Sequence, residues 1–164
     1  MSMEFARPYL EKIEKTLELP ADSLSLAYYS PNTGGYDPLT AVSKDGFPQD
    51  GRYIAMVYKL TPVSNYSLVG MFRLQQFTGC CAYAISCNAV VYAKYRHKGV
   101  NTIALQLRME IARKAGYTGL YATDVTGGFG LRTLIEAGFK ELQATKNRRT
   151  NNVVHLMFKD LYQE

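Results

Sequence analysis

A basic turn between two apolar segments is the part of the sequence best suited to chemistry. The turn, Lys94–Gly99, follows a short β-rich run, Ala89–Tyr92, and precedes an amphipathic segment. The first turn of a helix has unpaired N–H groups and a partial positive charge, and Gly99 lets the backbone approach a ligand closely. Because Arg96 and Lys98 add full charges, the pattern predicts an anion site, with a pyrophosphate as the natural ligand. A solvated turn that only connects a strand to a helix is the alternative.

The segments around the turn predict a strand–helix–strand unit. Apolar residues recur at helical spacing after the turn, at Val100, Ile103, Ala104, Leu107, Ile111 and Ala115. The polar residues lie off that face: Gln106, Arg108, Glu110, Arg113 and Lys114. Gly116 ends the helix. Thr118–Val125 follows at the spacing of a crossover, so we expect it to pair in parallel with a strand over Ala82–Tyr92. That strand is long enough to need a bulge around Ser86–Asn88.

The rest of the chain predicts two further helices and several strands. The expected elements are a helix over Ala6–Leu19, strands over Ser25–Ser30, Arg52–Leu60, Tyr66–Gln75, Phe139–Leu142 and Val153–Leu161, a helix over Leu131–Ala137, and loops over Pro31–Gly51, Thr61–Asn65, Thr126–Gly130 and Ala144–Asn152. In the first helix, Glu11, Lys12, Glu14 and Lys15 lie outside the apolar stripe. The order predicts one domain, residues 1–164, of the α/β (mixed α+β) class with a partly parallel central sheet.

The composition limits the classes of binding partner but does not select one of them. The 164 residues carry a net charge of +5, which suits an anionic ligand such as a nucleotide cofactor, a nucleic acid or an acidic protein. Three cysteines, Cys80, Cys81 and Cys87, form no disulfide framework, and two histidines give no zinc pattern. We therefore expect no metal. No apolar signal core and no stretch of membrane-spanning length are present, so we expect a cytoplasmic protein without a membrane partner.

Three patterns together resemble the GNAT superfamily of acyl-CoA-dependent N-acetyltransferases. The family's cofactor motif is Arg or Gln, two residues, Gly, one residue, then Gly or Ala, between a strand and a long helix. Here the stretch reads Arg96-His97-Lys98-Gly99-Val100-Asn101. Ala112–Tyr117 resembles the family's helix end, and Leu134–Phe139 resembles its second signature. The resemblance covers Arg52–Leu161, with residues 1–51 divergent, and implies a mostly antiparallel sheet with a parallel, splayed pair of strands flanked by helices.

The resemblance also implies a co-substrate, acetyl-CoA or another acyl-CoA, and the residues that would bind it. The CoA pyrophosphate would lie on the turn and the first helical residues, Arg96, His97, Lys98, Gly99, Val100, Asn101 and Thr102. The backbone of Ala89, Val90 and Val91 would pair with the pantetheine arm. Arg132 would reach the CoA phosphates or lie in solvent. The Thr118–Val125 strand would diverge from its neighbour and leave a cleft for the thioester.

The groups that usually catalyse acyl transfer in this family are missing from their usual places. Leu134 stands where many members have a tyrosine acid, Asn101 replaces a small residue, and the strand over Ala82–Tyr92 has no carboxylate base. The remaining catalytic candidates are Asp124 as a base or as a binder of a cationic substrate, Tyr83 and Tyr121 as acids, and Ser86 as a group that orients the thioester or relays a proton through water. Each has a plainer interpretation. Asp124 is favoured to cap the Thr126–Gly130 loop, and the tyrosines are favoured to pack. A bulge of small residues at Ser86 is an equally open interpretation.

The expected function is direct transfer of an acetyl group from acetyl-CoA to a primary amine in a ternary complex. The acceptor is an amine-bearing small molecule or protein, and a homodimer stays open as an oligomeric state. Two alternatives stay open. One is a catalytically silent CoA-binding interaction module, which the missing catalytic groups favour. The other is an enzyme of the same fold that modifies a nucleic acid or nucleotide, for which the basic loop Thr145–Asn152 is a weak indication.

Overall fold

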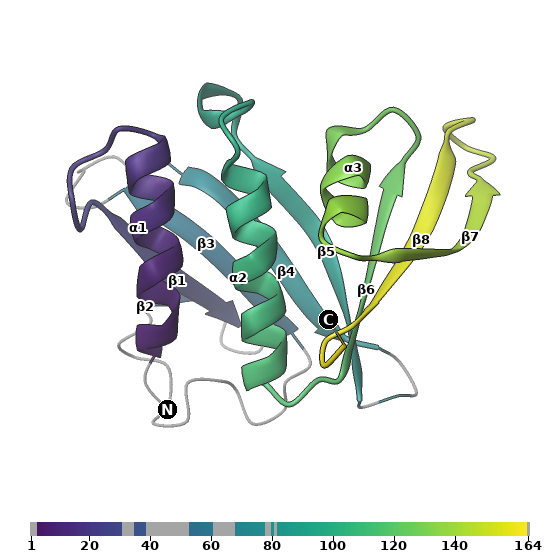
Figure 1. Cartoon of the computed structure of the whole chain (residues 1–164), viewed down its shortest axis with the longest axis horizontal. Coiled ribbons are helices and arrows are strands. Elements are labelled where there is room, and N and C mark those ends of the chain that lie inside the picture. The colour runs from purple at the N-terminus through teal and green to yellow at the C-terminus, as the bar shows by residue number, and fades with distance from the viewer. Residues whose placement is uncertain are drawn as a thin grey trace.

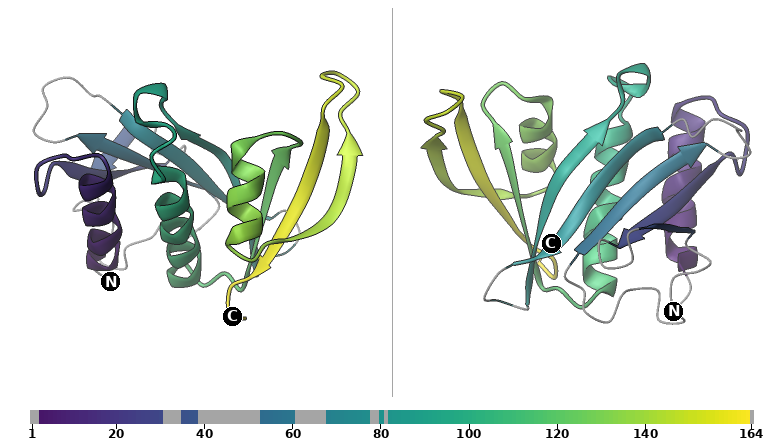
Figure 2. Two further views of the ribbon diagram at one scale, coloured as in Figure 1. Left: turned by 45° about the horizontal axis from the view of Figure 1, so that its top comes forward. Right: turned by 180° about the vertical axis from the view of Figure 1, so that it is seen from behind.

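The computed structural model describes residues 3–30, 35–38, 53–60, 68–77, 80 and 82–163. Eight strands form one sheet in the order β2-β1-β3-β4-β5-β6-β8-β7, and α1, α2 and α3 lie on one face of it (Figures 1 and 2). The helices are α1 (Arg7–Thr16), after a 3-10 turn over Met3–Ala6, α2 (Val100–Lys114) and α3 (Phe129–Glu136). The strands are β1 (Leu24–Ser30), β2 (Gly35–Pro38), β3 (Tyr53–Leu60), β4 (Leu68–Gln76), β5 (Tyr83–Val91), β6 (Gly119–Val125), β7 (Lys140–Lys146) and β8 (Val153–Asp160).

One pair of strands is parallel, and that pair shapes the molecule. β5 and β6 pair from Tyr83↔Gly119 to Ser86↔Ala122, and beyond this point the two strands diverge (Figure 1). The six other pairings are antiparallel. Between Cys87 and Val90, β5 has one residue more than the facing part of β4, which makes the predicted bulge. The mixed, mostly antiparallel sheet with a parallel splay is therefore confirmed.

Helix α2 is buried over a wider face than its apolar stripe predicts. It packs on the sheet and beside α1, so its buried residues are Val100, Ala104, Leu105, Leu107, Arg108, Met109, Ile111 and Ala112. The prediction that Arg108 lies off the buried face is wrong, because only 4% of this residue is exposed. The same holds for Glu14 in α1, which is 2% exposed. Both errors come from treating charged residue types as solvent-facing.

A partly buried ion pair between Arg7 and Glu14 fastens α1 to β1. Arg7 Nη2 donates to Glu14 Oε1 at 2.6 Å, and the Leu24 backbone N–H donates to Glu14 Oε2 at 2.8 Å. Arg7 Nη1 also donates to the Leu24 carbonyl oxygen at 3.2 Å. Burial by itself raises the pKa of Glu14, but the Leu24 N–H, the Arg7 guanidinium and the Asp22 N–H together bring that pKa below its ordinary value.

Several element boundaries differ from the sequence prediction, each for a visible reason. Gly35–Pro38 forms the edge strand β2 inside the predicted Pro31–Gly51 loop, because backbone pairing with β1 needs no apolar pattern. β7 runs on to Lys146, into the predicted polar loop, and every one of its residues is exposed. The rest of the Pro31–Gly51 loop and the predicted Thr61–Asn65 connection lie outside the described residues. In the described ranges, no helix combines the length and apolar character needed to cross a membrane.

Candidate active site

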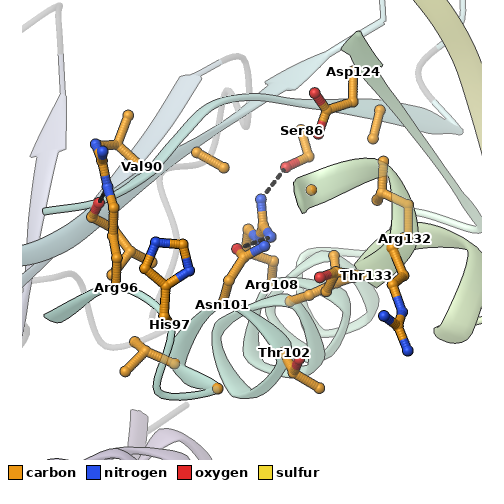
Figure 3. Close-up of a pocket in the computed structure, with 18 of the residues that line it drawn as sticks. Ser86, Val90, Arg96, His97, Asn101, Thr102, Arg108, Asp124, Arg132 and Thr133 are labelled. Atoms are coloured by element: carbon orange, nitrogen blue, oxygen red, sulfur yellow. Dashed lines mark hydrogen bonds between the residues drawn. The ribbon is translucent and has the colours of Figure 1, made fainter. Parts of the chain in front are cut away.

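The diverging ends of β5 and β6 open a cleft of about 680 Å³. Residues of β5, the basic turn, α2, β6 and α3 line it (Figure 3). Twelve of the predicted site residues are in this lining: Ser86, Ala89, Val90, Val91, Arg96, His97, Gly99, Val100, Asn101, Thr102, Asp124 and Arg132. The volume lies within the range of small-molecule and cofactor sites, about 300–1,000 Å³.

The basic turn forms one wall of the cleft and is fixed by its own backbone. His97 and Gly99 have positive φ values of 62° and 85°, so the chain reverses sharply before α2 begins. Arg96 Nε donates to the Val91 carbonyl oxygen at 2.6 Å, which joins the turn to the end of β5. Gly99 is the N-cap of α2, and no described side chain caps this helix. The first N–H groups of α2 therefore lie at the cleft as hydrogen-bond donors for an anion.

The basic side chains at the rim of the cleft are exposed to solvent. Arg96, His97 and Lys98 are exposed, and Lys98 is not among the lining residues. Arg132 lines the opposite rim, where its side chain is 85% exposed and its Nε donates to Glu136 Oε1 at 2.8 Å. The cations predicted to contact phosphate are thus exposed to solvent, whereas the turn between them and α2 is held by backbone geometry and the Arg96–Val91 hydrogen bond.

The closed end of the cleft holds a polar cluster that sequence reasoning missed in part. Arg108 Nη1 donates to Ser86 Oγ at 3.1 Å, and Arg108 Nη2 donates to Asn101 Oδ1 at 3.3 Å (Figure 3). We call these three residues the Arg108 cluster. Ser86 was a predicted site residue, but Arg108 was not. The available signal was its spacing, because Arg108 lies seven residues, or two helical turns, after Asn101 and so on the same face of α2.

The β6–α3 side of the cleft contains Asp124 and Leu134. The Asp124 carboxylate accepts the Val125 N–H at 2.7 Å and packs against the start of α3, where a Cβ added to the N-cap residue Gly128, or to Gly130 in the first turn of the helix, would clash with it. Asp124 therefore both lines the cleft and holds the glycine loop. Leu134 is 6% exposed and also lines the cleft. It presents an apolar side chain at the position where many members of the family have the hydroxyl group of a tyrosine.

The two candidate tyrosines lie outside the cleft lining. Tyr121 stacks on Phe77 with ring centroids 4.9 Å apart, and Tyr83 meets Tyr121 edge-on at 5.8 Å. Phe158 completes this aromatic cluster. Because side chains alternate along a strand, Tyr83 and Tyr121 project from the face opposite to Ser86 and Ala122. The packing interpretation accounts for both.

A second set of hydrogen-bonded polar side chains joins β6, β7 and β8 next to Asp124. His155, the cross-strand partner of Asp124 in β8, hydrogen-bonds through Nδ1 to Glu141 and lies with Nε2 2.6 Å from Thr126 Oγ1. These bonds tie the ends of β6, β7 and β8 together. Among the residues that the structure describes, no group of three or more His, Cys, Asp or Glu side chains could hold a metal ion.

Comparison of the structure with solved proteins identifies the fold. A GNAT-family acetyltransferase from Elizabethkingia anophelis, solved with acetyl-CoA bound, aligns with a TM-score of 0.60 and 14% identity over 85% of this chain and 99% of the other. A chimeric spermidine N-acetyltransferase from Vibrio cholerae aligns with a TM-score of 0.58 and 13% identity over 68% and 69% of the two chains. A ribosomal-protein-S5-alanine acetyltransferase from Vibrio fischeri gives 0.59 and 13% over 70% and 64%.

Sequence comparison adds no further relatives. No protein-family model and no curated protein matches the chain. The structural likeness, at identities well below 25%, rests on the arrangement of the sheet, the splayed parallel pair and the helices. The protein has the fold of the GNAT-family acetyltransferases.

Proposed function

We propose that the protein is an acyl-CoA-dependent N-acyltransferase that moves an acetyl group from acetyl-CoA to a primary amine. The observation that carries this proposal is the cleft itself. It begins at the last parallel pair of β5 and β6 and ends at the uncapped N-terminus of α2 beside Arg96. Acetyl-CoA bound to the relative from Elizabethkingia anophelis supports the same co-substrate here.

The residues of the cleft suit the chemistry of a CoA ester. Helical N–H groups of Val100, Asn101 and Thr102 would bind the pyrophosphate, and the cations at the rim would add screened charge. The β5 backbone over Ala89–Val91 offers hydrogen-bonding groups beside the bulge for the amides of the pantetheine arm. A bound thioester supplies an activated acyl carbon, which an uncharged amine attacks without further activation of the acyl group.

Acyl transfer to an amine requires little of the protein beyond the correct positioning of the amine against the thioester. The chain must hold the amine nitrogen against the acyl carbon, accept or relay one proton, and stabilise the departing sulfur. Asp124 and Ser86 are the proposed proton-handling groups within the cleft. The acceptor is an amine-bearing small molecule or protein, as the spermidine and protein-alanine acetyltransferases among the structural relatives illustrate for their own substrates.

A catalytically silent CoA-binding module is the second candidate, because one observation favours it. Leu134, buried in the cleft lining, provides no acidic proton where members of the family often have a tyrosine. The two candidates agree on cofactor binding and differ in turnover. Modification of a nucleic acid has less support, since the exposed cations Arg148 and Arg149 lie in the β7–β8 connection, which does not contribute to the cleft.

Binding and turnover can be tested in sequence. Acetyl-CoA at about 100 times its Kd should raise the free energy of unfolding by about 2.7 kcal/mol, measured by thermal or urea unfolding. Release of the CoA thiol is then followed with a panel of polyamines, amino acids and peptides. Stabilisation with turnover on one acceptor class supports the enzyme, and stabilisation without any turnover supports the silent module. No stabilisation by acetyl-CoA or CoA would contradict both.

A further inference from the structure

The hydrogen bonds of the Arg108 cluster determine which atoms of Ser86 and Asn101 remain available to a ligand. A guanidinium group carries donor hydrogens only and has no acceptor. Ser86 therefore accepts from Arg108 Nη1 through Oγ at 3.1 Å, and Asn101 accepts from Arg108 Nη2 through Oδ1 at 3.3 Å. The hydroxyl proton of Ser86 and the amide protons of Asn101 are left for other acceptors.

These remaining donors have no acceptor among the residues that the structure describes. Both side chains belong to the cleft lining, and Ser86 is only 5% exposed. A buried hydroxyl without an acceptor costs free energy until a ligand or a water molecule supplies one. This part of the cleft wall therefore favours a ligand that brings acceptor oxygens, such as carbonyl oxygens, over one that brings further N–H or O–H donors.

Arg108 is itself held in place, so it can orient the two side chains. It is 4% exposed, and its guanidinium carbon lies 5.5 Å from the centre of the buried Phe72 ring in β4. Its hydrogen bonds reach back along α2 to Asn101 and across to Ser86 in β5 (Figure 3). Asn101 stands where the family motif has Gly or Ala, neither of which has a side-chain acceptor for such a link.

The length of β5 indicates which part of a bound ligand would meet Ser86. Ser86 lies five residues before Val91, so about 16 Å of extended strand separates it from the end of β5 that leads into the basic turn. It also belongs to Ser86↔Ala122, the last parallel pair, at the closed end of the cleft. An extended arm whose phosphate end lies on the turn, as in the proposed function on which this inference rests, would bring its far end to Ser86. For a CoA ester, that end is the thioester, which carries a carbonyl oxygen.

We propose that Ser86 donates a hydrogen bond to the carbonyl oxygen of the bound thioester, and that Arg108 is the positioning residue that directs this donor into the cleft. Asn101 presents its amide protons to an acceptor oxygen nearer the basic turn on the same arm. These roles follow from the directions of the two hydrogen bonds and do not depend on the net charge of the guanidinium group. They leave Asp124 as the proposed proton acceptor in the cleft.

A donor on the carbonyl oxygen acts on the step that forms the new bond. The amine nitrogen bonds to the acyl carbon while the π electron pair of the carbonyl group moves onto oxygen. That pair then re-forms the double bond as the carbon–sulfur bond breaks with its electrons on sulfur, and the surplus ammonium proton is released. The products are an amide, a CoA thiolate and a proton. Because negative charge gathers on oxygen only during this exchange, an oriented donor stabilises the transition state more than the ground state.

The hydrogen bond to the carbonyl oxygen can be measured in the full-length protein without an amine acceptor. S-ethyl-CoA, a thioether with a methylene group in place of the carbonyl group, is the matched ligand. The wild type should bind acetyl-CoA about tenfold more tightly than S-ethyl-CoA in calorimetric titration, because the thioether leaves the Ser86 donor unpaired. The infrared carbonyl band of bound, isotope-labelled acetyl-CoA should lie at lower frequency in the wild type than in Ser86→Ala, since a hydrogen bond weakens the double bond.

Two variants of Ser86 assign these signals to its hydroxyl group. Ser86→Ala should remove the preference for acetyl-CoA over S-ethyl-CoA and raise the frequency of the carbonyl band. Ser86→Thr keeps a hydroxyl group at the same position, so it should retain both the preference and the lower frequency. A preference that Ser86→Thr loses to the same extent as Ser86→Ala would contradict the assignment to the hydroxyl group.

Variants of Arg108 test its positioning role. Arg108→Met should remove most of the preference although Ser86 is still present, because nothing then directs the hydroxyl proton into the cleft. Arg113→Met is the matched control and should behave as the wild type, because Arg113 lies on the same helix, donates to the Leu161 carbonyl oxygen at 2.6 Å and is not among the lining residues. If Arg108→Met does not fold, Arg108→Lys decides, since an ammonium group cannot hold both oxygens in one plane and must lower the preference.

The outcomes separate this inference from the proposed function. If neither acetyl-CoA nor S-ethyl-CoA binds, the proposed function itself fails. If both bind equally to the wild type, or if the preference survives in Ser86→Ala, Ser86 does not meet the carbonyl oxygen, while cofactor binding stands. If the preference and the band depend on Ser86 but are unchanged in the Arg108 variants, the positioning role of Arg108 is wrong.

Discussion

Two arginine clusters fasten a helix to the sheet, and they differ in burial and in their relation to the cleft. In the first, Arg7 of α1 meets the Glu14 carboxylate and the Leu24 backbone. In the Arg108 cluster, the guanidinium group meets the neutral oxygens of Ser86 and Asn101. The residues of the first are not part of the cleft lining, whereas those of the second are.

This difference indicates what each cluster does. A carboxylate paired with a guanidinium neutralises charge within the protein, and its loss leaves an uncompensated buried group. The Arg108 guanidinium belongs to the cleft wall and is placed beside whatever enters the cleft. We therefore expect the Arg7–Glu14 pair to affect stability and its pH dependence, and the Arg108 cluster to affect the ligand.

The largest expected effect on stability comes from breaking the Arg7–Glu14 pair. Glu14→Gln should lower the free energy of unfolding by about 2–3 kcal/mol, because it removes a buried charge partner. This loss is at the lower end of what breaking a buried ion pair costs, because the Arg7 side chain is one-third exposed. Urea unfolding measures this loss. Glu11→Gln is the matched control, since Glu11 is more than half exposed at 3.7 Å from Arg7, and it should cost less than about 0.5 kcal/mol.

The cofactor turn provides the largest expected effect on binding. Gly99→Val should weaken acetyl-CoA binding at least about tenfold, because a branched side chain strains φ at 85° and covers the N–H groups of α2. Calorimetric titration measures the change. Gly116→Val is the control, because Gly116 has a φ of 93° at the other end of the same helix. It should show similar backbone strain with unchanged affinity, and equal losses of affinity in both variants would refute the cradle.

The pH dependence of stability sharpens the contrast between the clusters. The pKa of Glu14 is lowered in the folded protein, so its contribution to stability is complete above its ordinary value of 4.5 and is lost as the pH falls through the folded value. The difference in unfolding free energy between wild type and Glu14→Gln should thus be constant above about pH 5.5 and shrink in acid. If this difference in unfolding free energy grew in acid, the pKa of Glu14 would be raised in the folded protein and not lowered.

A smaller effect is expected where Asp124 packs on the glycine loop. Gly130→Ala should cost about 1 kcal/mol in stability, because its Cβ meets the Asp124 carboxylate. In an Asp124→Ala background the same change should cost less, since the carboxylate is gone. A double-mutant cycle in urea gives this coupling. Additive effects would mean that Asp124 does not hold the loop.

The smallest expected effect on stability is that of Arg108→Met. Replacing the buried guanidinium by an apolar side chain, with Ser86 and Asn101 retained, should change the unfolding free energy by no more than about 1 kcal/mol. A loss as large as that of Glu14→Gln would show that both clusters serve stability and would remove the distinction between them.

The sequence was sufficient for elements that carry a regular apolar pattern. The strands around Ala89 and Leu120, helix α2 and the basic turn follow from such patterns, and they define most of the cleft. The edge strand β2 and the end of β7 carry no pattern, because backbone pairing alone holds them. The parallel pairing of β5 and β6 was predicted from the crossover spacing, and the family resemblance added their divergence. The order of the remaining strands was not predicted, since pairing over long range is not encoded in local periodicity.

Both arginine clusters escaped sequence analysis for one physical reason. Charged residues are rarely buried unless they are paired, so Glu14 and Arg108 were assigned to solvent by residue type. The partners that permit their burial, Leu24 N–H and Ser86 Oγ, come from strands distant in sequence. Spacing within α2 places Arg108 on the same face as Asn101, but only the folded arrangement brings the strand partners Leu24 and Ser86 to these helices.

Amide chemical-shift mapping of an acetyl-CoA titration tests the central claim most directly. If the cleft is the acyl-CoA site, the amides of Gly99, Val100 and Asn101, together with those of β5 from Ala89 to Val91, should shift in a saturable manner. The Leu24 amide, which reports on the Arg7–Glu14 pair, should not move. Saturable shifts centred elsewhere, or no shifts with acetyl-CoA in large excess, would contradict the account.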